Sequence, residues 1–248
     1  MSEASGTDPR QQIIDARKRS LAGCSNARNA IDLLADANSF TEYGLLAGHT
    51  TAVEDDGPSD GVVGGVCNID GQPVVIAAHD RSVEDGTHSE RNMRKLAKLI
   101  TIAVTNRWPV VLFIEGDGSR PTDPRPVPPI VNYTRARWDV LEGLTEMSGW
   151  APTVAVAVGA TCDSHAAMAF LCDIVIATRD AEFGSNIDSS DAQPSDIAAA
   201  RGDVDVLVDD IHEAITTTRQ FLSYWHYYSS DFSASDSAST SSQIVPDN

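Results

Sequence analysis

Runs of apolar and β-branched residues recur along the chain and predict six buried strands. Most of these runs are continuously apolar, so both faces of the predicted sheet are expected to be covered. The predicted strands lie at Gly61–Ile69, Pro73–Ala78, Pro109–Glu115, Thr153–Gly159 and Asp173–Thr178, and in the run VDVLV before Asp209.

Segments with helical spacing of apolar residues separate the later strands. The predicted helices lie at Ser89–Arg107, Val131–Ser148, Ser164–Leu171 and Asp209–Trp225. The order is a short hairpin followed by alternating strands and helices. That order predicts an α/β sheet covered by helices.

The two ends of the chain and one internal segment differ in composition from this folded body. Residues 1–9 and 229–248 are rich in Ser, Asp and Ala and are expected to be disordered, which leaves residues 10–228 as a single domain. The proline-rich segment Pro121–Pro129 follows a strand end, where α/β folds usually bind ligands. We expect either a lid beside a site or an ordinary connector there.

Composition narrows the function classes. The 248 residues are 42% hydrophobic and 22% charged, and 18 Lys and Arg against 36 Asp and Glu give a net charge of −18. This acidity argues against nonspecific binding to nucleic acid or to an anionic membrane. Apolar stretches fall short of the ~20 residues of a membrane span, and the polar N-terminus differs from a secretory signal, so a cytoplasmic protein is expected. The four scattered cysteines predict reduced, mostly buried thiols and no metal site.

Five segments share a family pattern in their residues and in their order. They are ARNAIDLLADANSFTEYG (Ala27–Gly44), DGVVGGVCNIDGQPVVIAAHD (Asp60–Asp80), GTHSERNMRKLAKLITIA, GDGSR (Gly116–Arg120) and GDVDVLVDDIHEAITTTRQFLSYW. Together they resemble the N-terminal half of the carboxyltransferase domain of biotin-dependent acyl-CoA carboxylases, in which GDGSR takes the place of SGGAR. The segment VGATCDSHAAMAFLCDIVIATRDAEFG also resembles the wider crotonase superfamily. The likeness covers about residues 20–225.

The resemblance implies an α/β fold of crotonase type (ClpP/crotonase), a spiral of stacked β-sheets and helices. It also implies that the chain binds an acyl-CoA as substrate, with no cofactor bound directly, and that a partner or another copy supplies the C-terminal half and the biotin. Crotonase relatives commonly form trimers or hexamers, so a homo-oligomer or a complex with a C-half subunit is expected. Neither nucleic acid nor a membrane is an expected partner.

Three positions depart from the family pattern. Asp85-Gly86, Asp117-Gly118 and Asp163-Ser164 each stand where the family has Gly-Gly. In the family, backbone N–H groups at such turns stabilise an enolate or an oxyanion formed from the thioester. We therefore expect catalytic amides at Gly86, Gly118 and Ser164. Asp163 is expected to act as a general base or a recognition group, and the alternative is that Asp163 or Ser164 caps the helix.

Three histidines lie near these positions in the sequence. His165 follows Ser164 and is a catalytic candidate, but adjacent residues at the start of a helix point in different directions, which argues against a nucleophile–base pair of the two. His79 ends the second predicted strand and His88 precedes the next helix, so both are placed to approach the same pocket. Solvated loop residues are the alternative interpretation, and for His88 the stronger one.

One predicted helix carries a cluster of cations. Arg91, Arg94, Lys95 and Lys98 fall at i, i+3, i+4 and i+7 and therefore share one helix face. This face predicts either a binding site for CoA phosphates or a solvated surface. Arg120 is retained from the SGGAR-like motif, and its planar guanidinium suits a carboxylate or a phosphate.

Three functions fit these observations. The first is an acyl-CoA carboxyltransferase-type subunit of a biotin-dependent carboxylase or decarboxylase, which predicts acyl-CoA binding and a C-half partner. The second is a biotin-independent crotonase-like enzyme that hydrolyses or decarboxylates an acyl-CoA or a 1,3-dicarbonyl compound, which the three aspartates favour. The third is a noncatalytic assembly subunit that binds a partner without turnover.

Overall fold

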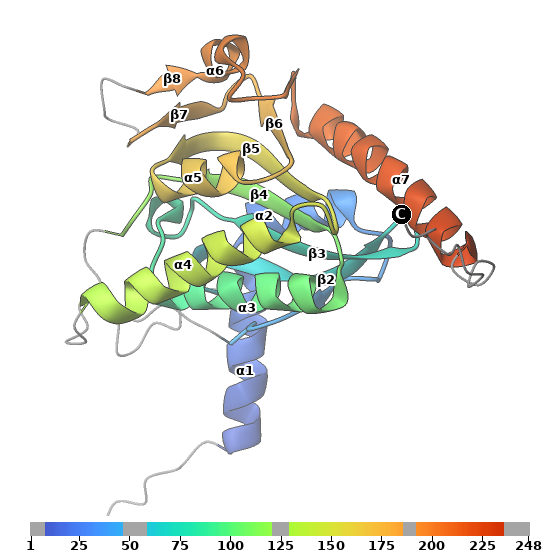
Figure 1. Cartoon of the computed structure of the whole chain (residues 1–248). Coiled ribbons are helices and arrows are strands. Elements are labelled where there is room, and N and C mark those ends of the chain that lie inside the picture. The colour runs from blue at the N-terminus through green and yellow to red at the C-terminus, as the bar shows by residue number, and fades with distance from the viewer. Residues whose placement is uncertain (1–7, 47–58, 121–128, 186–191, 236–248) are drawn as a thin grey trace, which may run out of the picture.

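A nine-stranded sheet forms the centre of the computed structural model, which describes residues 8–46, 59–120, 129–185 and 192–235 (Figure 1). Seven strands follow the order β1-β2-β3-β4-β5-β6-β9, while β7 pairs with β5 and with β8. The pairs from β3 to β9 along this order are parallel, and β1, β2 and β3 pair antiparallel. The strand bounds are β1 (Thr41–Glu42), β2 (Val62–Ile69), β3 (Gln72–His79), β4 (Val110–Gly116), β5 (Thr153–Cys162), β6 (Ile174–Thr178), β7 (Glu182–Gly184), β8 (Gln193–Pro194) and β9 (Val206–Val208).

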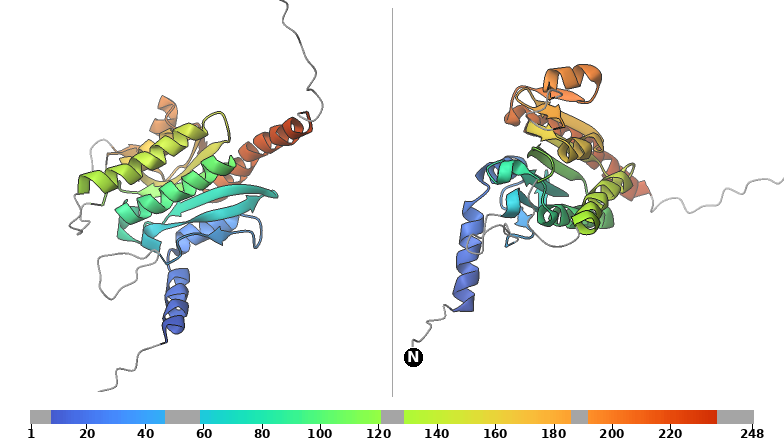
Figure 2. Two further views of the ribbon diagram at one scale, coloured as in Figure 1. Left: turned by 60° about the horizontal axis from the view of Figure 1, so that its bottom comes forward. Right: turned by 90° about the vertical axis from the view of Figure 1, so that its left-hand side faces the viewer.

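Helices cover both faces of the sheet. α3, α4 and α5 pack on one face, and α2 and α7 pack on the other (Figure 1). α1 extends away from this body as a separate rod (Figure 2). The helix bounds are α1 (Pro9–Ala22), α2 (Ser25–Leu34), α3 (Glu90–Asn106), α4 (Pro129–Met147), α5 (Ser164–Phe170), α6 (Ser195–Arg201) and α7 (Ile211–Ser235), with 3-10 turns η1 (Ser59–Gly61) and η2 (Glu84–Gly86).

Successive strand residues contribute to two separate cores. Val75 and Ala77 of β3 pack beneath α3, whereas Val74 and Ile76 point to the opposite face and pack beneath α2. All four are at most 1% exposed. Because side chains of a strand alternate between the two faces of a sheet, this arrangement confirms the prediction that both faces are covered.

The predicted hairpin and the alternation of strands and helices are both present. All six predicted strands and all four predicted helices occur, with small shifts at most of their ends. β2 and β3 are joined at Asp70 and Gly71, which have φ values of 50° and 80°. Positive φ at both positions is what a two-residue hairpin turn requires, and Asp-Gly is a preferred pair there.

Some elements were not predicted from the apolar pattern. α6, β1, β7 and β8 are too short to give a clear periodic signal, whereas the buried residues of α2 do fall at helical spacing over only ten residues and were overlooked. α7 runs to Ser235, past the predicted end at Trp225, so the expected start of a disordered tail at 229 is too early. An existing helix extends at small cost because nucleation is already complete. The calls of disorder at 1–7 and 236–248 and of a lid at 121–128 fall outside the described residues.

The predicted chemistry of the thiols agrees with the structure. No disulfide joins the four cysteines, which all lie among the described residues; three are buried, and Cys172 is half-buried. Burial raises the pKa of Cys24 to about 11, so its thiol stays protonated at neutral pH. None of the described helices combines the length and hydropathy that a membrane crossing requires.

Candidate active site

Chemically active side chains meet at the carboxyl ends of β3, β4 and β5. His79 is the last residue of β3, and β5 leads through Asp163 into Ser164, the first residue of α5. His88 lies between η2 and α3 and is fixed beside the loop after β4, because its N–H donates to the Gly118 carbonyl at 2.7 Å. This edge of a parallel sheet is where α/β folds usually place their sites.

Three histidines form a buried cluster at this edge. His79, His88 and His165 are at most 3% exposed. The Nε2 atoms of His79 and His88 lie 3.0 Å apart, and His79 Nδ1 lies 3.0 Å from the carbonyl oxygen of Phe113. The rings of His88 and His165 stack at 3.7 Å between centroids, with 14° between their planes. The expectation of a solvated loop position for His88 is therefore wrong, because the β3–β5 edge and α3 enclose it.

Ser164 takes His88, and not its neighbour His165, as its hydrogen-bond partner. The Ser164 hydroxyl lies 2.7 Å from His88 Nδ1. His165 instead accepts a hydrogen bond at Nδ1 from the N–H of Gly118, at 3.2 Å. The sequence argument that adjacent Ser164 and His165 do not face each other agrees with this geometry.

Burial keeps all three histidines neutral near pH 7. It lowers the pKa of His79 to about 4, and it lowers the pKa values of His88 and His165 well below 6.5. The cations Arg120 and Arg137 lower the pKa of His88 further. Neutral imidazoles have one donor and one acceptor nitrogen each, so His79 and His88 can form a directed chain of hydrogen bonds, whereas the buried Nε2 of His165 has no hydrogen-bond partner among the described residues.

Aspartates occupy backbone conformations that glycine adopts easily. Asp85 has a φ of 53°, and Asp163 combines a φ of 47° with a ψ of −111°. These two positions therefore fit the proposal that aspartate replaces glycine there. The amide of Gly86 donates to Val83 and that of Gly118 to His165. Neither glycine amide is thus available to a substrate in this arrangement. Ser164 is the first residue of α5, so its backbone N–H has no acceptor within the helix.

The carboxylate of Asp163 points toward partners of its own. Asp163 Oδ2 accepts a hydrogen bond from the Ser119 hydroxyl at 3.0 Å and lies 3.6 Å from the Arg137 guanidinium. The guanidinium partly balances the negative charge that would repel an oxyanion. Asp163 is about half exposed, so this balance is partly screened by solvent. The role of general base that the sequence suggested stays a prediction.

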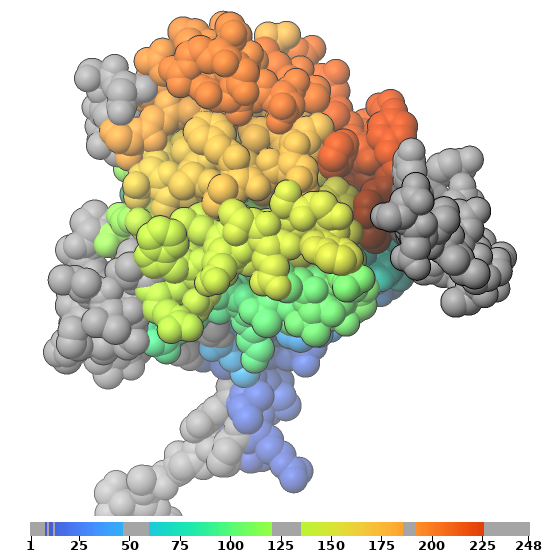
Figure 3. All heavy atoms as spheres, viewed as in Figure 1, coloured from blue at the N-terminus to red at the C-terminus, as the bar shows by residue number. Residues whose placement is uncertain are grey.

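A mostly apolar cavity of about 310 Å³ opens beside Ser164, between α3, α4 and α5. Figure 3 shows the outer face of the molecule on which α4 and α5 lie next to each other. Arg137, Asp163 and Ser164 supply its polar groups. Such a lining suits a ligand with an apolar body and one polar reacting group. The lining residues are Met93, Arg137, Trp138, Leu141, Asp163, Ser164, Ala167 and Met168.

The predicted cationic face does not stay together on the surface. Arg94 and Lys98 are exposed, but Lys95 is buried, donates to the Val62 carbonyl and lies 3.8 Å from Glu42. Burial lowers the pKa of Lys95 to about 8. The Lys95 ammonium group is therefore enclosed by the fold and is not placed to bind a CoA phosphate at the surface.

Arg120 is likewise committed to the fold. Its guanidinium pairs with Asp60 at 2.8 Å and donates to the hydroxyl and the carbonyl of Thr87. The side chains of Arg120 and Asp60 are only 4% and 3% exposed. The ion pair joins the loop after β4 to η1, and the bonds to Thr87 join the same loop to the segment before α3. The role of Arg120 in ligand binding stays a prediction.

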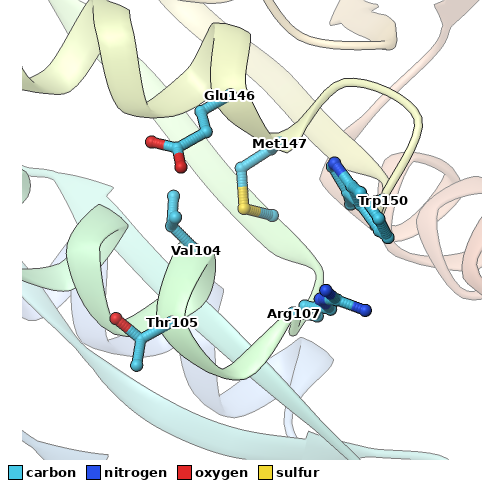
Figure 4. Close-up of a pocket in the computed structure, with 6 residues that line it drawn as sticks. All are labelled: Val104, Thr105, Arg107, Glu146, Met147 and Trp150. Atoms are coloured by element: carbon cyan, nitrogen blue, oxygen red, sulfur yellow. The ribbon is translucent and has the colours of Figure 1, made fainter.

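A second cavity, of about 400 Å³, lies at the far ends of α3 and α4 (Figure 4). Arg107 stacks over the Trp150 ring there, with 4.1 Å from Cζ to the ring centroid. The 17 residues of α3 separate this cavity from His88 by about 25 Å. It therefore belongs to a different part of the molecule from the histidine cluster.

Two contributors to the site were not singled out by the sequence as partners. The sequence placed His88 beside the same pocket as His79 but favoured a solvated loop position for it, and it did not identify His88 as the partner of Ser164. Arg137 gave no signal, because a single arginine within a predicted helix resembles any surface cation. Only the packing of α4 beside α5 brings Arg137 to Asp163.

Comparisons with known proteins give this geometry a family. The model of the carboxyl transferase domain matches residues 19–248. The propionyl-CoA carboxylase beta chain of Cereibacter sphaeroides is 28% identical over 177 residues, which cover 70% of this chain and 33% of the relative. The biotin-dependent long chain acyl-coenzyme A carboxylase beta4 subunit of Mycobacterium tuberculosis is 27% identical over 227 residues, with 84% and 41% covered.

A solved structure shows the same architecture. The single-chain, multi-domain long-chain acyl-CoA carboxylase matches with a TM-score of 0.74 and 27% identity, over 88% of this chain and 25% of that one. This likeness confirms the predicted crotonase-like fold. The chain spans about a third to two fifths of the length of the two curated relatives. Because the family model matches nearly the whole sequence, the chain belongs to the carboxyl transferase domain family.

Proposed function

We propose that this protein is the acyl-CoA-binding half of a carboxyltransferase that belongs to a biotin-dependent carboxylase or decarboxylase. The cavity beside Ser164 carries the proposal, because it joins an apolar lining to polar groups at the carboxyl ends of β3 to β5. The acyl group fits the apolar part, and the thioester carbonyl is directed toward the start of α5. Relatives named as propionyl-CoA and long chain acyl-CoA carboxylase subunits support this substrate class.

A complementary half is part of the proposal. The resemblance assigns biotin to the C-terminal half of the domain, and the matched region of each curated relative is less than half of that relative. Biotin supplies the carboxyl group when the partner brings it, and we assign no residue of this chain to it. This chain binds the acyl-CoA and orients its thioester.

Calorimetric titration of the purified chain with CoA, acetyl-CoA, propionyl-CoA and malonyl-CoA tests the substrate class. We expect propionyl-CoA to bind at least about tenfold more tightly than CoA, because burial of its two terminal carbons contributes ~0.8 kcal/mol each, and acetyl-CoA to fall between them. Equal affinities for CoA and all its thioesters would contradict the assignment of the cavity to the acyl group. No binding at millimolar ligand would refute the function.

The same titration locates the CoA phosphates. Neutralising the exposed pair Arg94 and Lys98 together is expected to weaken CoA and acyl-CoA binding to the same extent, by about tenfold, because both ligands share the phosphates. Neutralising Arg201, an exposed arginine at the end of α6, is the matched control and leaves the affinities unchanged. If the double variant binds like the wild type, the phosphates lie elsewhere.

A further inference from the structure

The hydrogen bonds of His79 and His88 fix where the protons of these two rings lie. A carbonyl oxygen only accepts, so His79 Nδ1 must carry a proton to bond Phe113. In a neutral ring His79 Nε2 is then an acceptor, and His88 Nε2 must donate to it across 3.0 Å. His88 Nδ1 is left as an acceptor and receives the hydroxyl proton of Ser164 at 2.7 Å. Each hydrogen bond in this series therefore donates in the same direction, from Ser164 to His88, from His88 to His79 and from His79 to the Phe113 carbonyl.

The alternative of a metal ion held by the cluster fits less well. The ligand atoms of His79, His88 and His165 do lie within 4.8 Å of one another. However, a metal ion lies near the plane of each imidazole that binds it, whereas the nearly parallel rings of His88 and His165 are stacked 3.7 Å apart. The 3.0 Å separation of two Nε2 atoms is also that of a hydrogen bond.

We propose that Ser164 is a nucleophile activated by His88, with His79 holding His88 in its reactive orientation. Ser164 is one of the residues that line the apolar cavity, and His88 is within hydrogen-bond reach of its hydroxyl proton. This arrangement of nucleophile, base and orienting group is one that supports acyl transfer. Its electrophile is an acyl thioester, a choice that rests on the proposed function.

The reaction balances with the groups present and water. Ser164 Oγ bonds to the thioester carbonyl carbon as its proton moves to His88 Nδ1. The C–S bond then breaks, His88 returns the proton to the leaving sulfur, and an acyl ester remains on Ser164. Water attacks that ester with His88 again taking the proton, which releases a carboxylic acid and restores the hydroxyl. Arg137 lines the same cavity and provides a positive charge for the oxyanion and the acid product.

Covalent labelling tests the nucleophile without acyl-CoA. The whole chain is treated with a fluorophosphonate, and adducts are located by mass spectrometry of peptides. We expect one adduct at Ser164, none in Ser164→Ala, and unchanged labelling in Ser223→Ala, which removes an exposed serine of α7. An unlabelled wild type, or labelling that Ser164→Ala does not remove, would overturn the proposal.

The base is tested by the rate of labelling and by acyl-enzyme formation from propionyl-CoA. His88→Asn keeps a hydrogen-bond acceptor near Ser164 but no base, and we expect labelling about 100-fold slower. Circular dichroism and urea unfolding confirm that the variant is folded. Labelling of folded His88→Asn at the wild-type rate would overturn the role of His88.

His79 is a positioning residue, and two replacements separate position from bulk. His79→Gln places its amide oxygen near the position of His79 Nε2, where it still accepts a hydrogen bond from His88. His79→Asn is shorter and keeps only the hydrogen bond to the Phe113 carbonyl. We expect Gln to retain most of the labelling rate and Asn to lose about tenfold, with kcat reduced and KM unchanged for thioester hydrolysis. Equal losses in both variants would contradict the orienting role.

Failure of this proposal is distinguishable from failure of the proposed function. If Ser164→Ala abolishes labelling and hydrolysis but binds propionyl-CoA like the wild type, both stand. Binding of acyl-CoA by a wild type that is never labelled would retain the function and refute the nucleophile. Stoichiometric zinc in the purified chain, lost together with labelling on chelation, would replace the hydrogen-bonded chain with a metal site.

Discussion

At the scale of single residues, Asp163 occupies a backbone conformation that most side chains avoid. Its φ of 47° and ψ of −111° place the chain where β5 turns into α5, next to Ser164. Strain of this kind costs of order 1–3 kcal/mol and persists where the surrounding structure holds it. The sharp turn is what brings Ser164 against His88.

Replacing Asp163 by Gly and by Ala measures this strain. Both variants lose the carboxylate and its contacts, but only glycine relieves the backbone. We expect Asp163→Gly to be more stable than Asp163→Ala by about 1–2 kcal/mol in urea unfolding, the reverse of the usual preference for alanine. Greater stability of the alanine variant would show that the turn is unstrained.

Gly116 is a second position where the site admits no side chain. A Cβ at this position would lie 2.5 Å from His165 Nε2 and 2.6 Å from the Gly86 carbonyl oxygen. Gly116→Ala is therefore expected to lower the free energy of unfolding by about 1–3 kcal/mol and to displace His165. Gly71→Asn is the control, because its site is open and Asn tolerates positive φ. Similar stability of the two variants in urea would contradict this account.

At the scale of elements, a buried ion pair connects the loop after β4 with η1, the turn that precedes β2. Arg120 and Asp60 are almost fully enclosed, and Arg120 also bonds Thr87. Removing one partner of such a pair leaves an unpaired buried charge and costs about 3–5 kcal/mol. Arg120→Ala is therefore expected to lose that much stability, whereas Arg135→Ala, which breaks the exposed pair with Asp139, loses less than about 1 kcal/mol.

The two arginine variants also separate a structural role from a ligand-binding role. In equilibrium unfolding, a loss below about 1 kcal/mol for Arg120→Ala would contradict the structural role of the ion pair. A folded Arg120→Ala that binds acyl-CoA like the wild type would show that the guanidinium acts through the fold. Loss of acyl-CoA binding without loss of stability would restore the contact that the sequence suggested.

Elements with strong periodic patterns could be predicted, and contacts between elements could not. The runs that form β2 to β6 and the apolar stripe of α3 are local signals, so the chain order of strands and helices was readable. The hydrogen bond between Ser164 and His88 joins residues 76 positions apart and depends on which strands are neighbours. Lys95 shows the same limit, since helical spacing gives its face but not whether that face is buried.

At the scale of the whole molecule, three neutral buried histidines make folding sensitive to acid. Their pKa values are lower in the folded chain than the usual 6.5, so the unfolded chain binds more protons below that pH. The stability is full above pH 6.5 and is lost as the pH falls, for His79 down to about pH 4. Each histidine contributes up to about 1.4 kcal/mol per pH unit in that window.

Urea unfolding at pH 7.5, 6.5 and 5.5 tests this dependence. We expect stability to fall mainly between pH 6.5 and 5.5, and to fall less in His88→Asn, which removes one of the three groups. Asp36 and Asp210 do not contribute to the change, because their pKa values are lowered from 3.8 and both groups therefore titrate below the pH range of this experiment. Equal stability at pH 6.5 and 5.5 would contradict the neutral cluster.

The chain matches the carboxyl transferase domain over residues 19–248 and spans 33% and 41% of the length of two curated relatives. If the proposed function holds, these 248 residues alone are expected to transfer no carboxyl group, because the carboxylated biotin is bound by the complementary half. Incubation of the purified chain with propionyl-CoA and carboxylated biotin should therefore yield no methylmalonyl-CoA by mass spectrometry. Turnover by this chain alone would contradict the need for a complementary half.

The most direct test of the central claim is the affinity of propionyl-CoA for a chain whose cavity is filled. Ala167 lines the cavity on the exposed side of α5, so tryptophan at this position occupies the space with little cost to the core. Ala200→Trp, on the exposed side of α6, is the matched control. The account predicts that Ala167→Trp weakens propionyl-CoA at least tenfold by calorimetry, while the control binds like the wild type. Equal binding by all three proteins would show that the acyl group lies elsewhere.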